Sequence, residues 1–268
     1  MPGPIVTLTT DWGEGGFFAG MVKGRLYSLI PDVRVVDICH TLKPFDLRVA
    51  PYLIKSACTG FPPDTVHIID ILSEEESGEG FVIVRYKSQY YICTNNGLPY
   101  MVFGNDYEQA VEINLNWQAL SQNFAAYEIF CEQAARLIAG TSLTEIGRDV
   151  ALVEKRFRYF VMGNTIKTHV WYIDSYGNVY LDIRSDELER ECGDCKFDLI
   201  YRGNRIKDEL EKTYADCREP SLTVSSSGFI EIAMYKQRVC DILGISLLDT
   251  VDIVIKVNEK VQAKQTIV

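Results

Sequence analysis

The sequence predicts an α/β protein with two domains: an N-terminal α/β domain on a largely parallel sheet, and a smaller β-rich C-terminal domain. In the first half of the chain, apolar β-branched runs alternate with helix-like segments, the usual pattern of parallel strands joined by crossover helices. Beyond about residue 160 helical segments become sparse and short strands follow one another. We therefore expect domains over residues 1–160 and 161–268, each of ordinary size.

The elements of the N-terminal domain follow from apolar runs and the breaks between them. Residues 5–9 predict a buried strand, and the glycine-rich loop 11–16 leads into a helix over 18–30 that ends before Pro31. The other predicted elements are strands over 34–38 and 65–72, helices over 47–58 and 125–139, and a hairpin of 81–86 with 90–93.

The C-terminal domain shows mainly strand signals. Residues 168–174 and 178–183 flank the turn at 175–177 and predict a hairpin. Further strands are expected over 197–201, 221–224 and 251–257.

Composition narrows the class of protein. Hydrophobic residues make up 47% and charged residues 24% of the chain, which is typical of a folded globular protein. The net charge of −10 argues against a nucleic acid or an anionic membrane as partner. The N-terminus lacks the pattern of a signal peptide, and no apolar run reaches the ~20 residues of a membrane span. We therefore expect a cytoplasmic protein.

The cysteines give no sign of a disulfide framework or a metal centre. All 8 are spread over predicted strands and helices, so we expect reduced thiols. Cys192 and Cys195 form the only CxxC pair, and the three histidines show no paired spacing that would complete a zinc site. We predict neither a metal nor a cofactor.

Asp11 is the first candidate site residue. It follows the first predicted strand, where ligands bind in open α/β sheets. A carboxylate there can accept hydrogen bonds from a ribose diol, and the flanking glycines let a ligand approach the backbone. Alternatively, Asp11 caps the helix that follows. The local sequence leaves both interpretations open.

Six motifs are spread in order along nearly the whole chain. They are TTDWG at 9–13 with later glycines at 20 and 24, DICH at 37–40, FPPDTVH at 61–67, NNGL at 95–98, IDSYGN at 173–178 and SSSGFIEIA at 225–233. Together they resemble the motifs of the S-adenosylmethionine hydroxide adenosyltransferases, a family related to the fluorinases and chlorinases.

The resemblance implies a homotrimer that binds adenosine or S-adenosylmethionine between the N-terminal domain of one subunit and the C-terminal domain of its neighbour. Asp11 would hold the ribose hydroxyls, and Phe45 would wall the ribose and sulfonium region. In the C-terminal half-site, Tyr176 would stack on adenine and Asn178 would offer amide hydrogen bonds. The remaining implied ligand-site residues are Asp174, beside them, and Ser226, near the methionine end or the adenine edge. Alternatively, Phe45 belongs to the core and Asn178 simply adopts a left-handed turn conformation.

The sequence departs from the family where chemistry would occur. The hydrolases are believed to hold the nucleophilic water with an Asp, an Arg and a His, and an ungapped alignment places Leu72, Glu79 and Ala125 there. Asp70 is a candidate substitute, because residues two apart in a strand face the same side. The acidic stretch 73–78 replaces a glycine-rich loop, and we interpret it as a solvated loop.

A second departure concerns the methionine end of the site. Gly16 stands where relatives carry the Asp that holds the methionine ammonium group, and Tyr235 replaces an Asn. Losing such a carboxylate removes a charge-assisted hydrogen bond of about 1.5–3 kcal/mol.

Two functions remain open at this stage. One is a divergent hydrolase or adenosyltransferase that displaces methionine from the ribose C5′ of S-adenosylmethionine. The other is a non-catalytic protein that binds adenosine, S-adenosylmethionine or a related nucleoside. A scaffold that kept only the trimer is disfavoured by Asp11, Tyr176 and Asn178.

Overall fold

The computed structural model describes residues 3–73, 80–115, 124–193, 195–207 and 209–256. The chain divides into two compact units, residues 1–156 and 157–268. The predicted fold class is confirmed: the first unit is a mixed α/β sheet with parallel core strands, and the second is an antiparallel β domain.

The N-terminal unit is built on one sheet with the strand order β2-β1-β3-β5-β4-β6-β7. Strands β2, β1, β3 and β5 are parallel, and the later strands pair antiparallel. Their bounds are β1 Ile5–Thr10, β2 Arg34–Cys39, β3 Val66–Asp70, β4 Phe81–Tyr86, β5 Gln89–Thr94, β6 Gln109–Ile113 and β7 Gly147–Asp149.

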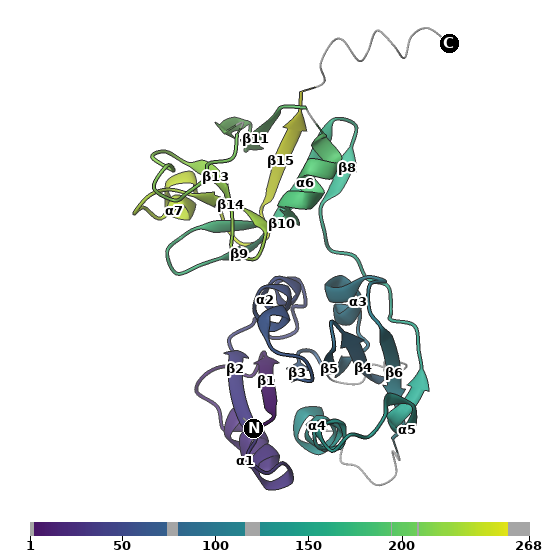
Figure 1. The fold of residues 1–268 in the computed structure, drawn as a ribbon. Helices are drawn as coiled ribbons and strands as arrows, with labels where there is room; N and C mark the ends of the chain where they lie inside the picture. The colour runs from purple at the N-terminus through teal and green to yellow at the C-terminus, as the bar shows by residue number, and fades with distance from the viewer. Residues whose placement is uncertain (1–2, 74–79, 116–123, 194, 208, 257–268) are drawn as a thin grey trace, which may run out of the picture. The chain divides into compact units, whose positions relative to one another are not determined.

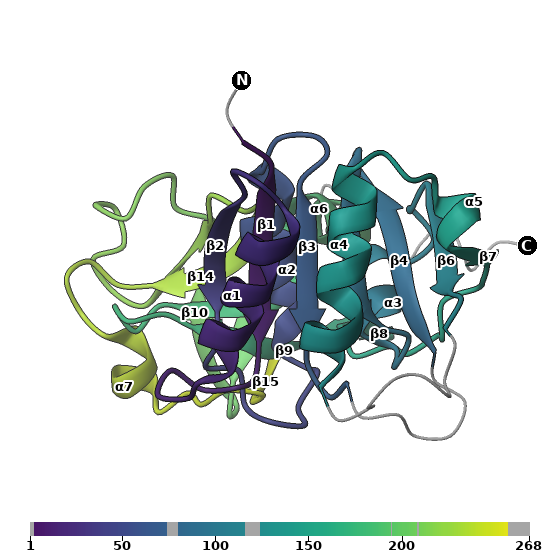
Figure 2. The same cartoon turned by 90° about the horizontal axis from the view of Figure 1, so that it is seen from below.

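Helices cover both faces of this sheet (Figure 1). One face carries α1 (Phe18–Leu29) and α4 (Cys131–Ile138), and the other carries α2 (Ala50–Ala57) and α3 (Leu98–Phe103). Figure 2 shows α1 and α4 lying side by side across the strands. The short η1 (Cys58–Gly60) extends α2, the π-helical η3 (Ala126–Phe130) precedes α4, and α5 (Leu143–Ile146) leads into β7.

Side chains alternate between the two faces of the central strands. Val6 and Leu8 of β1 point into the apolar core beneath α1 and α4, together with Val66 and Ile68 of β3. Strand β1 lies between β2 and β3. The chain passes from β1 to β2 on one side and then returns past β1 to β3 on the other. This is the switch point of the sheet, where crossovers diverge and a ligand can approach the carboxyl ends of the strands.

The named strands of the C-terminal unit pair antiparallel, in the order β12-β11-β15-β9-β10-β14-β13 with β8 paired to β9. The long strand β9 pairs with β15 along its first half and with β10 along its second, which curves the sheet. The elements are β8 Phe160–Met162, β9 Thr165–Ile173, β10 Val179–Arg184, α6 Ser185–Cys192, β11 Phe197–Tyr201, β12 Asn204–Lys207, β13 Ser221–Val224, β14 Phe229–Ala233, α7 Val239–Leu243 and β15 Thr250–Ile255.

Several boundaries differ from the sequence-based expectations. Strand β3 ends at Asp70 rather than at residue 72, because Leu72 adopts a left-handed backbone conformation with φ 48°. The helix expected over 125–139 begins with the π-helical η3. Helix α6 was not predicted, because its sequence SDELEREC lacks an apolar stripe.

The described residues show neither a disulfide nor an arrangement suited to a metal. All eight cysteines are free thiols, and burial raises the pKa of Cys58 and of Cys93 to about 12. Within the described ranges, no group of three or more His, Cys, Asp or Glu side chains is placed to hold a metal ion. Nor does any helix there have the length and apolar character needed to cross a membrane.

Candidate functional site

Asp11 lies directly after β1 at the switch point of the sheet. Its Oδ2 accepts the backbone N–H groups of Phe45 and Leu72, both at 3.4 Å. Helix α1 begins only at Phe18 and has no side-chain cap, so Asp11 is not the cap of that helix. Among the described residues Oδ1 has no hydrogen-bond partner, which leaves this oxygen able to accept from a ligand.

The two residues whose N–H groups face Asp11 have unusual backbones. The φ angle is 64° at Phe45 and 48° at Leu72. Such conformations cost roughly 1–3 kcal/mol in residues with a Cβ and are concentrated at functional sites. The side chain of Phe45 is 69% exposed, so Phe45 does not belong to the core. It stands beside the Asp11 carboxylate as a free aromatic surface.

Asp70 ends β3 opposite Thr10 of β1 and is buried. Its carboxylate accepts the indole N–H of Trp12 at 2.8 Å. Burial, with a smaller contribution from the negative charge of Asp11, raises the pKa of the Asp70 carboxyl to about 6. Asp70 continues the face of Val66 and Ile68, toward α1 and α4.

The expected pairing of Asp70 with Leu72 on one strand face is wrong. The strand stops before Leu72, which turns away with a left-handed backbone and directs its N–H to Asp11. Asp70 is instead covered by Trp12, whose ring stacks on His40 at 5.7 Å between centroids and meets the edge of Phe124 at 5.3 Å.

Of the two remaining positions where the family would hold water, Ala125 carries no group that could do so. Ala125 is 6% exposed and its methyl group packs in the apolar core under α1 and α4. Glu79 lies outside the described residues.

Gly16, at the predicted methionine end of the site, is exposed. A Cβ placed there would meet Phe18 Cδ2 only at 3.5 Å, so the backbone has room for a side chain.

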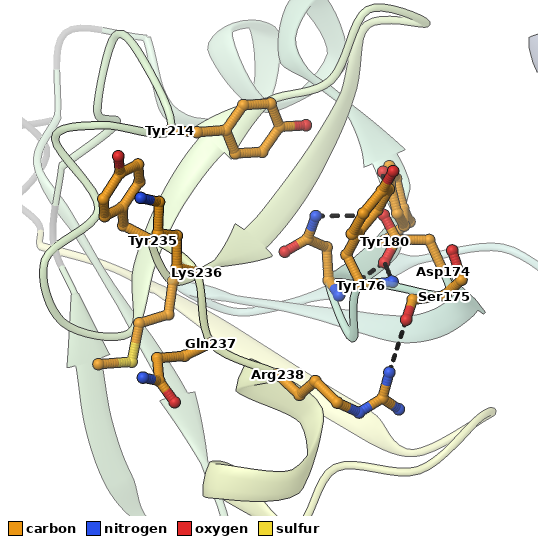
Figure 3. A pocket seen from close by; sticks show the side chains of 11 residues that line it. Asp174, Ser175, Tyr176, Tyr180, Tyr214, Tyr235, Lys236, Gln237 and Arg238 are labelled. Carbon is orange, nitrogen blue, oxygen red and sulfur yellow. Dashed lines mark hydrogen bonds between the residues drawn. The ribbon is translucent and has the colours of Figure 1, made fainter.

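A pocket of about 660 Å³ opens in the C-terminal unit, at the turn between β9 and β10 (Figure 3). Four tyrosines contribute to its walls, together with cationic and amide side chains. The lining residues are Asp174, Ser175, Tyr176, Asn178, Tyr180, Tyr214, Met234, Tyr235, Lys236, Gln237 and Arg238.

Asp174 organises the turn that forms one side of this pocket. Its Oδ1 accepts the backbone N–H groups of Tyr176 and Asn178, both at 2.9 Å. Its Oδ2 accepts the side-chain amide of Asn178 and the hydroxyl of Tyr180, both at 3.1 Å. The left-handed position of the turn is Gly177, with φ 82°, and not Asn178. The alternative that Asn178 simply adopts a left-handed turn conformation is therefore wrong.

The predicted residues of the C-terminal half-site are only partly brought together. Asp174, Tyr176 and Asn178 line one pocket, and the ring of Tyr176 is 77% exposed and open to stacking. Ser226 lies in the exposed turn between β13 and β14, at the end of β14 away from Met234, and does not line the pocket.

Among the residues at this pocket that were not predicted from sequence, three form one polar group: Tyr180, Tyr214 and Glu231. Tyr180 and Tyr214 line the pocket, and the Tyr214 hydroxyl donates to both carboxylate oxygens of Glu231, at 3.0 and 2.8 Å. Glu231 has no exposed surface. The position of Glu231 between two isoleucines in an apolar run could have indicated a polar site from the sequence alone. Nothing in the sequence marks Tyr214 as its partner.

The fold is that of an α/β protein with a polar cluster at strand ends and a separate aromatic pocket in a β domain. The chain belongs to the S-adenosylmethionine hydroxide adenosyltransferase family. The N-terminal domain of that family matches residues 6–147 and its C-terminal domain matches residues 168–252. The resemblance inferred from the motifs is thereby confirmed.

Individual relatives are distant but extend over most of the chain. An (R)-S-adenosyl-L-methionine hydrolase from Methanocaldococcus jannaschii is 25% identical, over 93% of this chain and 95% of its own. A fluorinase from Nocardia brasiliensis is 26% identical, over 86% and 90%. The crystal structure of an uncharacterized conserved protein from Thermotoga maritima has a TM-score of 0.80 at 24% identity, covering 93% of this chain and 99% of that one.

Proposed function

We propose that this protein binds the adenosine part of S-adenosylmethionine or of a related nucleoside. The observation that carries the proposal is the Asp174 turn, which presents the exposed ring of Tyr176 and the amide of Asn178 at a pocket of about 660 Å³. A purine stacks well on an exposed tyrosine, and an amide beside it can bind the edge of the base.

The ribose would be held by Asp11. Its Oδ2 is already occupied by two backbone N–H groups, which fixes the carboxylate and leaves Oδ1 for a hydroxyl. As in the interpretation from the family motifs, we propose that a homotrimer brings the Asp11 half-site of one subunit to the Tyr176 half-site of a neighbour, with Phe45 beside the ribose. Sedimentation equilibrium of the purified protein tests this assembly, and a monomer at micromolar concentration contradicts it.

Calorimetric titration with adenosine and with S-adenosylmethionine tests binding. We expect Asp11→Ala to weaken adenosine binding at least tenfold, about 1.4 kcal/mol, because charge-assisted hydrogen bonds are lost. Asp106→Ala is a control, since Asp106 is an exposed acid that lies outside the site motifs. Equal affinity of the wild-type protein and Asp11→Ala would refute this placement of the ribose.

A second candidate function is displacement of methionine from S-adenosylmethionine, giving adenosine when water attacks C5′. It is favoured by Asp70, a buried carboxyl at the switch point whose pKa is raised to about 6 by burial. Leu72 and Ala125 argue against hydrolysis, because neither side chain has a group able to hold a water molecule.

Incubation with S-adenosylmethionine, with and without chloride, separates the two functions. Adenosine or chlorinated adenosine released together with methionine demonstrates catalysis, whereas adenosine binding without turnover supports the binding protein.

A further inference from the structure

Glu231 is buried beneath the C-terminal pocket, in the middle of a strand. It lies on β14 with no exposed surface, opposite Tyr180 of β10 and Thr223 of β13. Tyr214 lines the pocket (Figure 3), and its hydroxyl donates to the Glu231 carboxylate. Glu231 therefore touches two residues of the pocket wall without lining the pocket itself.

The Tyr180 hydroxyl is shared between two acids. It donates to Oδ2 of Asp174 at 3.1 Å, and it is also within hydrogen-bonding reach of Glu231. A hydroxyl group carries one proton and can satisfy only one carboxylate at a time. If both acids are ionised, they compete for that proton. If Glu231 is protonated, Tyr180 can donate to Asp174 alone.

The surroundings of Glu231 favour its neutral form. The titratable groups that face it are Tyr180 from β10, Asp174 at the end of β9, and Tyr214 and Cys217 from the segment before β13. Strand β13 adds only the uncharged Thr223. Among these described neighbours there is no cation, and the half-buried carboxylate of Asp174 makes ionisation of the buried Glu231 less favourable. Burial raises the pKa of Glu231 to about 7, and the charge of Asp174 acts in the same direction.

We propose that Glu231 carries a proton in the ligand-binding form of the pocket, and that this proton leaves the Tyr180 hydroxyl free to hold Asp174. Glu231 is then a positioning residue. It acts through Tyr180 and Asp174 on the turn that presents Tyr176 and Asn178. The inference rests on the proposed function, because it concerns the affinity of the same pocket for a nucleoside.

The proposal predicts that the affinity of the pocket for a purine falls as the pH rises. Loss of the proton adds a second negative charge beside Asp174 and draws the Tyr180 hydroxyl toward Glu231. The turn that depends on Asp174 then loses one of its hydrogen bonds, and the pocket binds a purine less well. Affinity is therefore highest below the pKa of Glu231 and falls as the pH rises through it.

Calorimetric titration of the full-length protein with adenosine, which has no group that titrates between pH 6 and pH 8, measures this effect. We expect the affinity of the wild-type protein to fall about tenfold between these pH values, the ratio of the protonated fractions of a group whose pKa is about 7. Glu231→Gln retains a neutral group of the same shape, with a donor and an acceptor. It should keep the affinity of pH 6 at both pH values.

Asp182→Asn is the matched control. Asp182 is also a buried acid whose pKa is raised by burial, and it lies on the same face of β10, but it binds His169 rather than the pocket. This variant should show the same tenfold fall as the wild-type protein. The inference is overturned if wild-type affinity is equal at both pH values, or if Glu231→Gln retains the fall.

Infrared difference spectra of the ligand-free protein provide a readout that does not depend on binding. A protonated carboxyl band present at pH 6, lost by pH 8 and missing in Glu231→Gln supports the protonated Glu231. If this band is present and adenosine binds at neither pH, the proposed function fails while the protonation of Glu231 stands. If the variant has the same spectra as the wild-type protein, the inference fails even where adenosine binds.

Discussion

The indole N–H of Trp12 is bonded at 2.8 Å to the buried carboxylate of Asp70, and this bond joins the loop after β1 to the end of β3. By joining them, the bond holds these two chain segments together at the switch point of the sheet. Trp12 is packed between His40 and Phe124, so Asp70 is shielded from solvent on the side of α1 and α4. Asp11, one residue earlier, accepts the backbone N–H groups of Phe45 and Leu72 instead.

Replacing Asp70 tests the structural role of this bond. Asp70→Ala leaves the Trp12 indole without an acceptor and should lower the free energy of unfolding by about 1–3 kcal/mol.

The stability of the protein should also depend on the protonation of Asp70. Because the folded-state pKa of Asp70 is raised to about 6, its contribution to stability is fully present below about pH 4 and is lost as the pH rises through about 6. Urea denaturation at pH 4.5 and pH 7 should show a smaller difference for Asp70→Asn than for the wild-type protein. Identical pH dependence in the two proteins contradicts the assignment.

Gly16→Asp should restore recognition of the methionine end. Gly16 is exposed and a Cβ there finds room beside Phe18, so stability should change by less than about 0.5 kcal/mol. A new bond to the ammonium group should raise affinity for S-adenosylmethionine roughly tenfold to a hundredfold and leave adenosine binding unchanged. Gly15→Asp, at a position with open space around it, controls for added charge. Equal gains for both variants would show a general electrostatic effect.

Gly177→Ala should disturb the Asp174 turn. Its φ is 82°, and a Cβ would come within 2.7 Å of Arg238 Cβ and 2.8 Å of Arg238 Cα. We expect a loss of more than about 1 kcal/mol in unfolding free energy, together with weaker adenosine binding. Gly203→Ala has a similar φ of 78° with nothing within 4 Å, so it reports the backbone cost alone. A Gly177→Ala variant no less stable than Gly203→Ala contradicts the close contact with Arg238.

Tyr176→Ala should weaken adenosine binding roughly tenfold without loss of stability. The ring is 77% exposed and contributes little to the core, whereas stacking of a base on an aromatic side chain contributes about 1–3 kcal/mol. Tyr176→Phe keeps the stacking surface and should bind as the wild-type protein does. Calorimetry gives the affinities and thermal unfolding gives the stabilities. Weak binding by Tyr176→Phe would mean that the hydroxyl, not the ring, contacts the ligand.

The order of elements and the family were accessible from sequence because their signals are local. Strand β1 is an apolar run followed by glycines, and the DSYGN segment marks a turn by the residues it contains. Asp11 could be selected for the same reason, since its place after a strand depends only on its neighbours in the chain. The interpretation of Asp70 and Leu72 failed because it required the strand to continue. The end of β3 is set by a left-handed residue that forms part of a tertiary contact with Asp11.

By itself the sequence determined the fold class, the family and three of the residues that meet at the C-terminal pocket: Asp174, Tyr176 and Asn178. Only the tertiary structure decided that Glu231, Tyr180 and Tyr214 form one hydrogen-bonded group beneath them. The physical reason is that motifs record which side chains are present, whereas protonation depends on burial and on the charges nearby. Those are set by strands β10 and β14 and the segment before β13, which are far apart in the chain and meet only when it folds.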